Sequence, residues 1–324
     1  MRTVLVLVTS TDDGFDRVSL QALALGSAVA AGGPVHALLI GDGSPAAELG
    51  GWGASQVHVA THPGLAGSAA GSAPDAIGRI LDDLADRLGA DAVIGAGTEA
   101  GNGVMARAAA RAGRPFAANC IASTPGNTLT VTRQRWGGSL LEEAVIHADR
   151  AFLTVAPHTV IATPTAGTAS VAAFTPQLDD ADLLVRVVER VPAEVSGVSL
   201  AEAKVVVTGG RGAGSAQGFA PVLELADLLG AAVGCSRAVT ISGWRPHTEQ
   251  VGQTGTKIAP DLYILAGVSG ATQHMAGCKG AKRILAINKD PDAPVMAAAD
   301  YAVVGDLHEV LPAISAEIRR RRSA

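Results

Sequence analysis

Short aliphatic, β-branched runs alternate with longer alanine-rich segments of helical period through the first part of this 324-residue chain. The predicted strands are Thr3–Val8, Val35–Gly41 and Ala90–Gly97, and the predicted helices are Ser19–Ala31, Asp75–Leu88 and Val104–Ala112. Such alternation favours a parallel sheet with right-handed crossovers, because parallel neighbours need a connection long enough to hold a helix. Three further runs predict added, antiparallel strands at Thr128–Gln134, Glu143–His147 and Leu153–Ala156.

A second alternating unit follows a segment without apolar periodicity, VPAEVSGVSLAEA at 191–203. It begins with a strand at Lys204–Gly210 and continues with a helix at Pro221–Leu229 and strands at Leu262–Ala266, Arg283–Asn288 and Tyr301–Val304. The prediction is an α/β protein of two doubly wound, mostly parallel-sheet domains, 1–190 and 204–324, joined by a linker at 191–203.

Composition excludes several functional classes. A net charge of −5 argues against a general nucleic-acid binder, and the basic run Arg319–Arg322 is interpreted as a solvated helix end. Residues 151–178 carry no formal charge, but three prolines and six threonines within them argue against membrane insertion. The apolar run Val4–Val8 is too short for a signal peptide and is interpreted as the first strand.

The three cysteines, Cys120, Cys235 and Cys278, lie far apart in the chain and form no CxxC motif. This spacing predicts neither a zinc site nor a disulfide framework, and it is typical of a reducing compartment. We therefore expect a cytoplasmic protein without a bound metal.

Small and amide-bearing residues are concentrated on both sides of the apolar run Leu262–Gly267: QVGQTG at Gln250–Gly255 and SGATQH at Ser269–His274. Gly, Ser and Thr allow a backbone to approach a ligand closely, and a helix beginning near Ala271 is expected to aim free N–H groups at an anion. Directional hydrogen bonds can come from the side chains of Gln253, Thr254 and Gln273. The pattern favours a large, polar, phosphate-bearing cofactor.

The segment TGGRGAGS at Thr208–Ser215 follows a predicted strand and precedes a predicted helix. It fits neither the dinucleotide-binding nor the P-loop motif, so it is either a phosphate cradle or an ordinary tight turn. Arg211 favours the cradle, because a guanidinium can form a bidentate contact with a pyrophosphate.

Other candidate residues also have local explanations. Ser236-Arg237 could be surface residues, Asn288 a turn residue and Asp306 a helix N-cap. Ligands of open α/β sheets bind at the carboxyl ends of the strands, and several candidates follow predicted strands directly. These are Arg211, Ser236, Arg237, Ser269–His274, Asn288 and Asp306. Their shared position predicts one binding edge of one sheet.

Motifs of substrate conversion are missing from the sequence. It contains no G-x-S-x-G, no H-E-x-x-H and no paired carboxylates in a recognisable catalytic loop. A cofactor site without such machinery favours a carrier over an enzyme.

The sequence resembles the alpha subunit of electron-transfer flavoproteins over Val205–Leu311. The motifs that carry the resemblance are VVVTGGRG, AAVGCSRAV, QVGQTG, PDLYILAGVSGATQHMAGCK, AINKDPDAPV and ADYAVVGDL. The resemblance implies a Rossmann-like C-terminal domain that binds FAD. The implied cofactor-binding residues are Arg211, Ser236, Arg237, Val251, Gly252, Gln253, Thr254, Ser269, Gly270, Ala271, Thr272, Gln273, His274, Asn288, Asp306 and Leu307.

The resemblance also implies a role for each group of residues. Arg211 and the Ser269–His274 backbone are expected to hold the phosphates and ribityl chain. Ser236, Asn288 and Asp306-Leu307 are expected at the adenosine end, and Gln253 beside the ring. The expected flavin-tuning residues are Arg237, Thr254 and His274: Arg237 and His274 supply positive charge, and the Thr254 hydroxyl supplies a donor.

The family further implies a heterodimer with a beta subunit that carries AMP. Such a pair takes electrons from acyl-CoA dehydrogenases or related flavoproteins, as in fatty acid beta-oxidation, and passes them to a membrane-bound quinone oxidoreductase. An electron-bifurcating or pathway-specific member is the alternative within the family, and a nucleotide-binding module of an enzyme or regulator is the alternative outside it. The N-terminal half, including LTVAPHTVIATP and RWGGSLLEEA, departs from the family pattern, as do Cys235 and Cys278.

Overall fold

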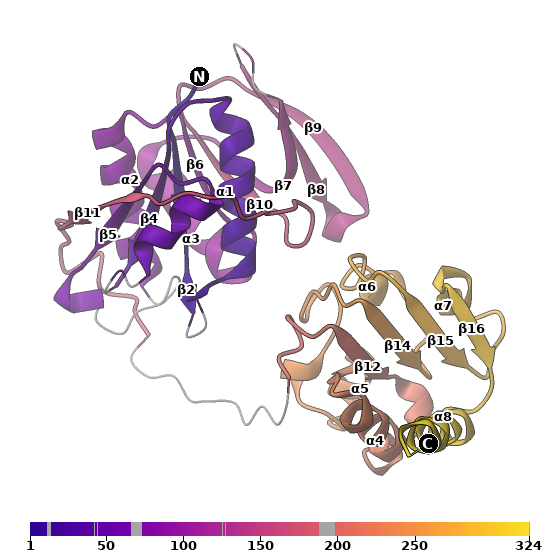
Figure 1. The fold of residues 1–324 in the computed structure, drawn as a ribbon. Coiled ribbons are helices and arrows are strands. Elements are labelled where there is room, and N and C mark those ends of the chain that lie inside the picture. The colour runs from indigo at the N-terminus through magenta and orange to yellow at the C-terminus, as the bar shows by residue number, and fades with distance from the viewer. Residues whose placement is uncertain are drawn as a thin grey trace. The chain divides into compact units, whose positions relative to one another are not determined.

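The protein divides into two compact units, Met1–Arg190 and Val191–Ala324. The structure, a computed structural model, describes residues 1–11, 14–41, 43, 45–65, 73–124, 126, 128–187 and 198–323. Of the predicted linker at 191–203, residues 191–197 lie outside the described residues. Figure 1 shows the elements of each unit.

The N-terminal unit is built on a sheet in the order β11-β5-β4-β1-β6-β10-β7-β8-β9, and β2 and β3 form a separate antiparallel pair. Its helices are α1 (Arg17–Ala30), α2 (Pro74–Leu88) and α3 (Glu99–Ala112). Its strands are β1 (Val4–Leu7), β2 (Ser10–Thr11), β3 (Gly14–Phe15), β4 (Val35–Ile40), β5 (Gln56–Ala60), β6 (Ala92–Ala96), β7 (Phe116–Thr124), β8 (Leu129–Arg135), β9 (Leu140–Ile146), β10 (Ala151–Val155) and β11 (Ser170–Phe174).

Helices cover both faces of this sheet. α1 packs on one face through residues such as Leu23 and Val29, and α2 and α3 pack on the other through residues such as Ile80 and Met105. The four residues of β1 are all buried, as expected for a central strand with helices on both faces.

One prediction about strand direction was wrong. β8 and β9 are antiparallel to their neighbours, as predicted, but β10 runs parallel to both β6 and β7. β10 inserts between those two strands, so the chain leaves the β7–β8–β9 meander and returns to the middle of the sheet. The pairing is therefore set by distant strands and not by sequence neighbours.

The C-terminal unit is built on a smaller sheet, whose five strands are all parallel in the order β13-β12-β14-β15-β16. Its strands are β12 (Val205–Gly209), β13 (Ala232–Cys235), β14 (Leu262–Ala266), β15 (Ile284–Asn288) and β16 (Tyr301–Val304). Its helices are α4 (Ala220–Leu229), α5 (Arg237–Ile241), α6 (Thr272–Met275), α7 (Pro294–Ala298) and α8 (Leu307–Arg322).

The strand order reverses between β12 and β14, because the chain moves from β12 to β13 on one side and then to β14 on the other. α4 and α8 pack on one face of the sheet, and residues of α7 and of the loops around α6 pack on the other. The connections that leave β12 and β14 continue to opposite sides of the sheet at such a reversal, which is where open α/β sheets bind ligands.

α8 begins at Asp306, whose carboxylate accepts a hydrogen bond from the His308 N–H, as the N-cap interpretation predicted. Its basic end is held by ion pairs from Arg319 to Glu224 and from Arg320 and Arg321 to Glu317. No helix among the described residues is both long and apolar enough to span a membrane.

Candidate functional site

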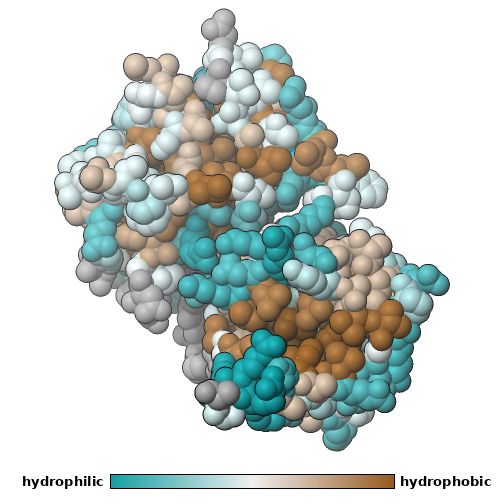
Figure 2. Space-filling view, turned by 45° about the vertical axis from the view of Figure 1, so that its right-hand side comes forward, coloured by the Kyte–Doolittle hydropathy of each residue, from teal (hydrophilic) through white to brown (hydrophobic). Residues whose placement is uncertain are grey.

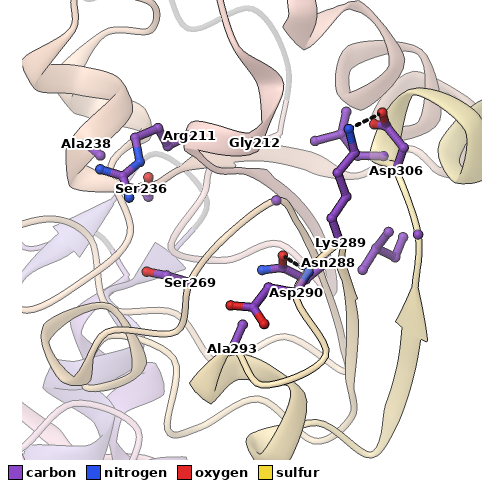
Figure 3. Close-up of a pocket in the computed structure, with 14 residues that line it drawn as sticks. Arg211, Gly212, Ser236, Ala238, Ser269, Asn288, Lys289, Asp290, Ala293 and Asp306 are labelled. Carbon is purple, nitrogen blue, oxygen red and sulfur yellow. Dashed lines mark hydrogen bonds and ion pairs between the residues drawn. The ribbon is translucent and has the colours of Figure 1, made fainter.

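A pocket of about 430 Å³ lies at the carboxyl ends of the strands of the C-terminal unit (Figure 3). Residues after each strand line it: Arg211 and Gly212 after β12, Ser236 and Ala238 after β13, Gly267 and Ser269 after β14, Ile287–Asp290 and Ala293 at and after β15, and Gly305–Leu307 after β16. This volume falls within the range of roughly 300–1,000 Å³ that is usual for cofactor sites.

Glycines allow the loops after β12 and β14 to touch at the reversal point. Gly212 donates a backbone hydrogen bond to the Gly267 carbonyl at 3.0 Å. A Cβ on Gly210 would lie 2.2 Å from the same carbonyl oxygen, and one on Gly212 would lie 2.7 Å from the Gly267 Cα. Gly267 has a φ of +66°, a conformation that other residues rarely adopt. The contact between the loops leaves no room for side chains.

This packing settles the local structure of the TGGRGAGS segment. Arg211–Ala213 form a single 3₁₀ turn, and the neighbouring glycines are required by the β14 loop. The Arg211 side chain is exposed, lines the pocket and makes no hydrogen bond or ion pair with any described residue. An unpaired guanidinium at the edge of a concave site is available to bind an anionic ligand.

The opposite side of the pocket is braced by polar contacts within the chain. The Asn288 amide donates to the Val268 carbonyl at 2.8 Å and accepts from the Asp290 N–H at 3.1 Å. Lys289 forms an ion pair with Asp306 at 2.7 Å, visible in Figure 3. The hydrogen bond from Lys289, followed by that from the His308 N–H, lowers the pKa of the Asp306 carboxyl. Asp306 therefore stays anionic while it caps α8.

A second pair of loops brings together Gln250–Gly255 and the segment around α6. The Gln253 N–H donates to the Gln273 carbonyl at 2.8 Å, and a Cβ on Gly277 would lie 2.5 Å from the Gly252 Cα. The Thr254 hydroxyl accepts a hydrogen bond from the Gln250 amide at 2.9 Å. Its own proton is therefore free to be donated to a ligand.

The helix expected near Ala271 is present but short. Ala271 is the N-cap of α6, which contains only four residues, so the helix begins where it was predicted but contributes little dipole. Ser269 and Thr272 are exposed beside it, while Gly270, with a φ of +79°, packs against the Val295 backbone.

His274 is buried, with only 7% of its surface exposed. Its Nε2 lies 2.9 Å from the Tyr263 hydroxyl, and its enclosed Nδ1 has no partner among the described residues. Burial lowers the pKa of His274 to about 4, so the imidazole is neutral near pH 7. The expectation that His274 contributes positive charge therefore does not agree with this structure.

The structure thus separates the candidate residues into two groups. Six line the pocket: Arg211, Ser236, Ser269, Asn288, Asp306 and Leu307. The others lie outside it: Arg237, Val251, Gly252, Gln253, Thr254, Gly270, Ala271, Thr272, Gln273 and His274. Arg237 is the exposed first residue of α5, directly after the pocket residue Ser236.

Sequence reasoning missed several pocket residues, including Gly212, Gly267, Lys289, Asp290 and Gly305. The rule that ligands bind after strand ends could have found them, since each lies within three residues of a strand. No group of three or more potential metal-ligating side chains occurs among the described residues.

Two features of the C-terminal unit show whether it is suited to bind FAD: a buried polar atom without a hydrogen-bond partner and the glycine-rich loops. Nδ1 of His274 is enclosed without a partner, and the β12 and β14 loops form a glycine-lined edge with a free guanidinium. Both features suit a large cofactor with phosphates at one end and hydrogen-bonding atoms at the other. The residues at this site are therefore compatible with bound FAD.

Comparisons with known proteins extend over both units. A family profile described as "Electron transfer flavoprotein FAD-binding domain" matches residues 199–279, and one described as "Electron transfer flavoprotein domain" matches residues 4–179. The electron transfer flavoprotein subunit alpha of Bacillus subtilis (strain 168) is 35% identical, with 98% of each chain covered. That of Mycobacterium tuberculosis (strain H37Rv) is 39% identical, with 99% of this chain and all of the relative covered.

Protein FixB of Clostridium saccharobutylicum is 34% identical, with 99% of this chain and 97% of the relative covered. The full-length matches include the N-terminal half, where the motif resemblance was weaker. Residues 199–279 are an electron transfer flavoprotein FAD-binding domain, and FAD is the cofactor of this chain. The chain belongs to the electron transfer flavoprotein alpha subunit family.

Proposed function

We propose that this chain is the FAD-carrying half of a heterodimer with an AMP-carrying beta subunit. In this proposal the pair accepts electrons from acyl-CoA dehydrogenases or related flavoprotein dehydrogenases and delivers them to a membrane-bound quinone oxidoreductase. The observation that carries the proposal is the pocket at the strand reversal, where the unpaired Arg211 guanidinium lies beside a glycine-lined edge. The cytoplasmic location expected from cysteine usage belongs to the same proposal.

In this proposal the candidate residues that line the pocket and those that lie outside it bind different parts of FAD. Arg211 and Ser269 hold the phosphates, and the pocket residues Ser236, Asn288, Asp306 and Leu307 hold the adenosine end. Gln253, Thr254 and His274 lie around the ring from the second pair of loops, and Arg237 does so from the start of α5. The parallel sheet with its reversal between β12 and β14 supports a Rossmann-like arrangement for this domain.

The flavin supplies the redox chemistry when bound, since it can take up and release electrons. The guanidinium of Arg237 favours added negative charge nearby. The Thr254 hydroxyl accepts a hydrogen bond from Gln250, so its own proton can be donated to the cofactor. These residues orient and tune a cofactor, and they convert no substrate, so the chain acts as an electron carrier.

A strip of uncovered apolar surface on the C-terminal unit supports a protein partner. Tyr301 and Val303 of the edge strand β16 are 63% and 36% exposed. They lie opposite Leu285 and Ile287 of β15, which pack on the same sheet face as α8. α8 adds a groove of about 620 Å³ lined by Val310, Ala313, Ile314 and Ile318 together with the charged residues Glu309, Glu317 and Arg321. Figure 2 shows this apolar area, which suits a partner segment beside α8.

The N-terminal unit also has an open sheet edge. Leu141 and Val145 of the edge strand β9 are 65% and 48% exposed. Exposed aliphatic side chains on an unpaired edge favour contact with another chain. We therefore assign residues 1–190 to the interface with the beta subunit, residues 191–203 to the linker and residues 204–324 to the FAD domain.

Anaerobic electron transfer tests the proposal. The FAD-loaded heterodimer is mixed with a catalytic amount of an acyl-CoA dehydrogenase and an acyl-CoA substrate, and bleaching of the heterodimer flavin is followed by absorbance. Bleaching that requires both dehydrogenase and substrate is expected. If a panel of flavoprotein dehydrogenases leaves the flavin oxidised while NADH reduces it directly, the donor assignment is wrong and a bifurcating role replaces it.

A further inference from the structure

Tyr263 and His274 form a buried pair that does not line the pocket. Tyr263 lies on β14 and is fully buried, and its hydroxyl is 2.9 Å from Nε2 of His274. The two rings are nearly parallel, with 8° between their planes. Nδ1 of His274 is enclosed without a hydrogen-bond partner among the described residues. A buried polar atom without a partner is costly, so this nitrogen is suited to a group that the chain itself does not supply.

The groups around this pair are all neutral. Burial lowers the pKa of His274 to about 4 and raises the pKa of Tyr263 well above its usual value. The thiols of Cys235 and Cys278 face the hydroxyl, and burial raises the pKa of each to about 12. The remaining neighbour, Thr208 on β12, carries no charge. Only the placement of the protons within the pair is therefore left to determine.

Counting unsatisfied groups distinguishes the two tautomers. If Tyr263 donates to Nε2, the imidazole proton resides on Nδ1, and Nδ1–H is the one group of the pair without a partner. If Nε2–H donates to Tyr263, the Nδ1 lone pair lacks a partner and the phenol proton can turn only toward Thr208, whose buried hydroxyl forms no hydrogen bond of normal geometry. Imidazole nitrogen is also a better acceptor than phenol oxygen. Both arguments favour donation by Tyr263.

We propose that Tyr263 is a positioning residue that fixes His274 as the Nδ1–H tautomer and thereby presents a hydrogen-bond donor to the bound FAD. The first half of the proposal concerns this chain alone. The second half rests on the proposed function, which places His274 beside the flavin ring. A neutral N–H donor can bond an electron-rich cofactor atom without adding a buried charge.

Nitrogen NMR of the FAD-loaded heterodimer, with this chain carrying [¹⁵N]histidine, tests the first half. The His274 signals are those that disappear in His274→Gln. We expect a pyrrole-type signal for Nδ1 and a pyridine-type signal for Nε2. Tyr263→Phe, which removes only the hydroxyl, should shift the pattern toward Nε2–H. The matched change Tyr301→Phe, at the second tyrosine of the chain, should leave it unchanged, because Tyr301 is not the hydrogen-bond partner of His274. A pyridine-type Nδ1 in the unaltered protein overturns the proposal.

Comparison with the FAD-free heterodimer tests the second half. The Nδ1 signal is expected to move when FAD binds, and Tyr263→Phe is expected to weaken FAD affinity about two- to tenfold, the loss of one neutral hydrogen bond. In His274→Asn, whose amide N–H replaces the Nδ1 donor, Tyr263→Phe should have a smaller effect. If the Nδ1–H signal has the same chemical shift with and without FAD, the tautomer assignment stands, but the placement of His274 at the cofactor is contradicted.

Discussion

Arg211 and Arg237 are both exposed arginines next to glycine-rich loops, yet their positions give them different tasks. Arg211 lines the pocket, whereas Arg237 lies outside it at the first position of α5. Neither guanidinium forms an ion pair with a described residue. A side chain without a protein partner loses nothing within the fold when it is truncated, so substitution of either residue reports on the ligand.

Arg211→Ala is expected to weaken FAD binding by about one to two decades, since a charge-assisted hydrogen bond contributes roughly 1.5–3 kcal/mol. Titration of the FAD-free heterodimer with FAD measures the change. Arg283→Ala is the matched control, because Arg283 is an exposed arginine of the same unit that pairs with Asp300 away from the pocket. Equal affinities for the two variants would remove Arg211 from the site.

Arg237→Ala is expected to lower the first one-electron reduction potential of the bound flavin while most of the FAD is retained. A loss of about 1.5–3 kcal/mol corresponds to roughly 60–130 mV, at 59 mV per tenfold change. Spectroelectrochemical titration measures the potential, and Arg237→Lys, which keeps the charge, should recover much of it. A shift of less than about 20 mV, well below that range, would assign Arg237 a structural role.

At the scale of elements, the site depends on contact between the β12 and β14 loops. Gly267→Ala is expected to destabilise the C-terminal unit by about 2 kcal/mol or more, because a positive φ costs roughly 1–2 kcal/mol and its Cβ would also collide with Gly212. Gly230→Ala is the control: Gly230 has a similar φ of +60° but open space around it. Urea unfolding that shows equal losses for the two would argue against a tight loop contact.

Strongly periodic elements were predictable from the sequence, and non-local pairing was not. β14 and β16 have the predicted bounds, and α2 begins one residue early, because each is a clear apolar run or amphipathic helix. β5, β7 and β11 were missed, because none is a continuous run of large aliphatic residues: β5 contains Gln and His, β7 Asn, Ser and Thr, and β11 mostly small residues. The parallel direction of β10 depends on distant strands that no local pattern records.

For the site as well, local sequence rules found some residues, and features that depend on distant elements were missed. The strand-end rule found five pocket residues because it depends only on where strands stop, and the sixth, Leu307, came from the family resemblance. It could not show that His274 is buried and neutral, because its burial depends on side chains from other elements. The ion pair between Lys289 and Asp306 was also missed, since it joins the ends of β15 and β16.

At the scale of the whole molecule, buried histidines make stability depend on pH. Burial lowers the pKa of His36 and His58 in the N-terminal unit, and the pKa of His274 to about 4 in the C-terminal unit. The unfolded chain, with histidine pKa values near 6.5, therefore binds more protons than the folded chain below that pH. Stability is full above about pH 6.5 and is lost as the pH falls toward 4.

Urea unfolding at pH 7.5 and pH 5 should show this loss, with two transitions if the units unfold separately. His58→Gln is expected to reduce the pH dependence of the N-terminal unit, because His58 is buried and lies 3.2 Å from His36. The exposed His247 provides the control variant, His247→Gln. If the stability of both variants, His58→Gln and His274→Gln, depends on pH as strongly as that of the unaltered protein, the pH dependence originates in the carboxylates and not in these histidines.

The central claim is that this chain carries FAD as one half of a heterodimer. Gel filtration with absorbance detection, applied to the chain alone and to the chain co-expressed with its beta subunit, tests that claim most directly. The exposed edge of β9 and the apolar strip along β16 and α8 lead us to expect one FAD per heterodimer and an unstable or flavin-poor single chain. A flavin-free heterodimer, or a monodisperse single chain fully loaded with FAD, would contradict the account.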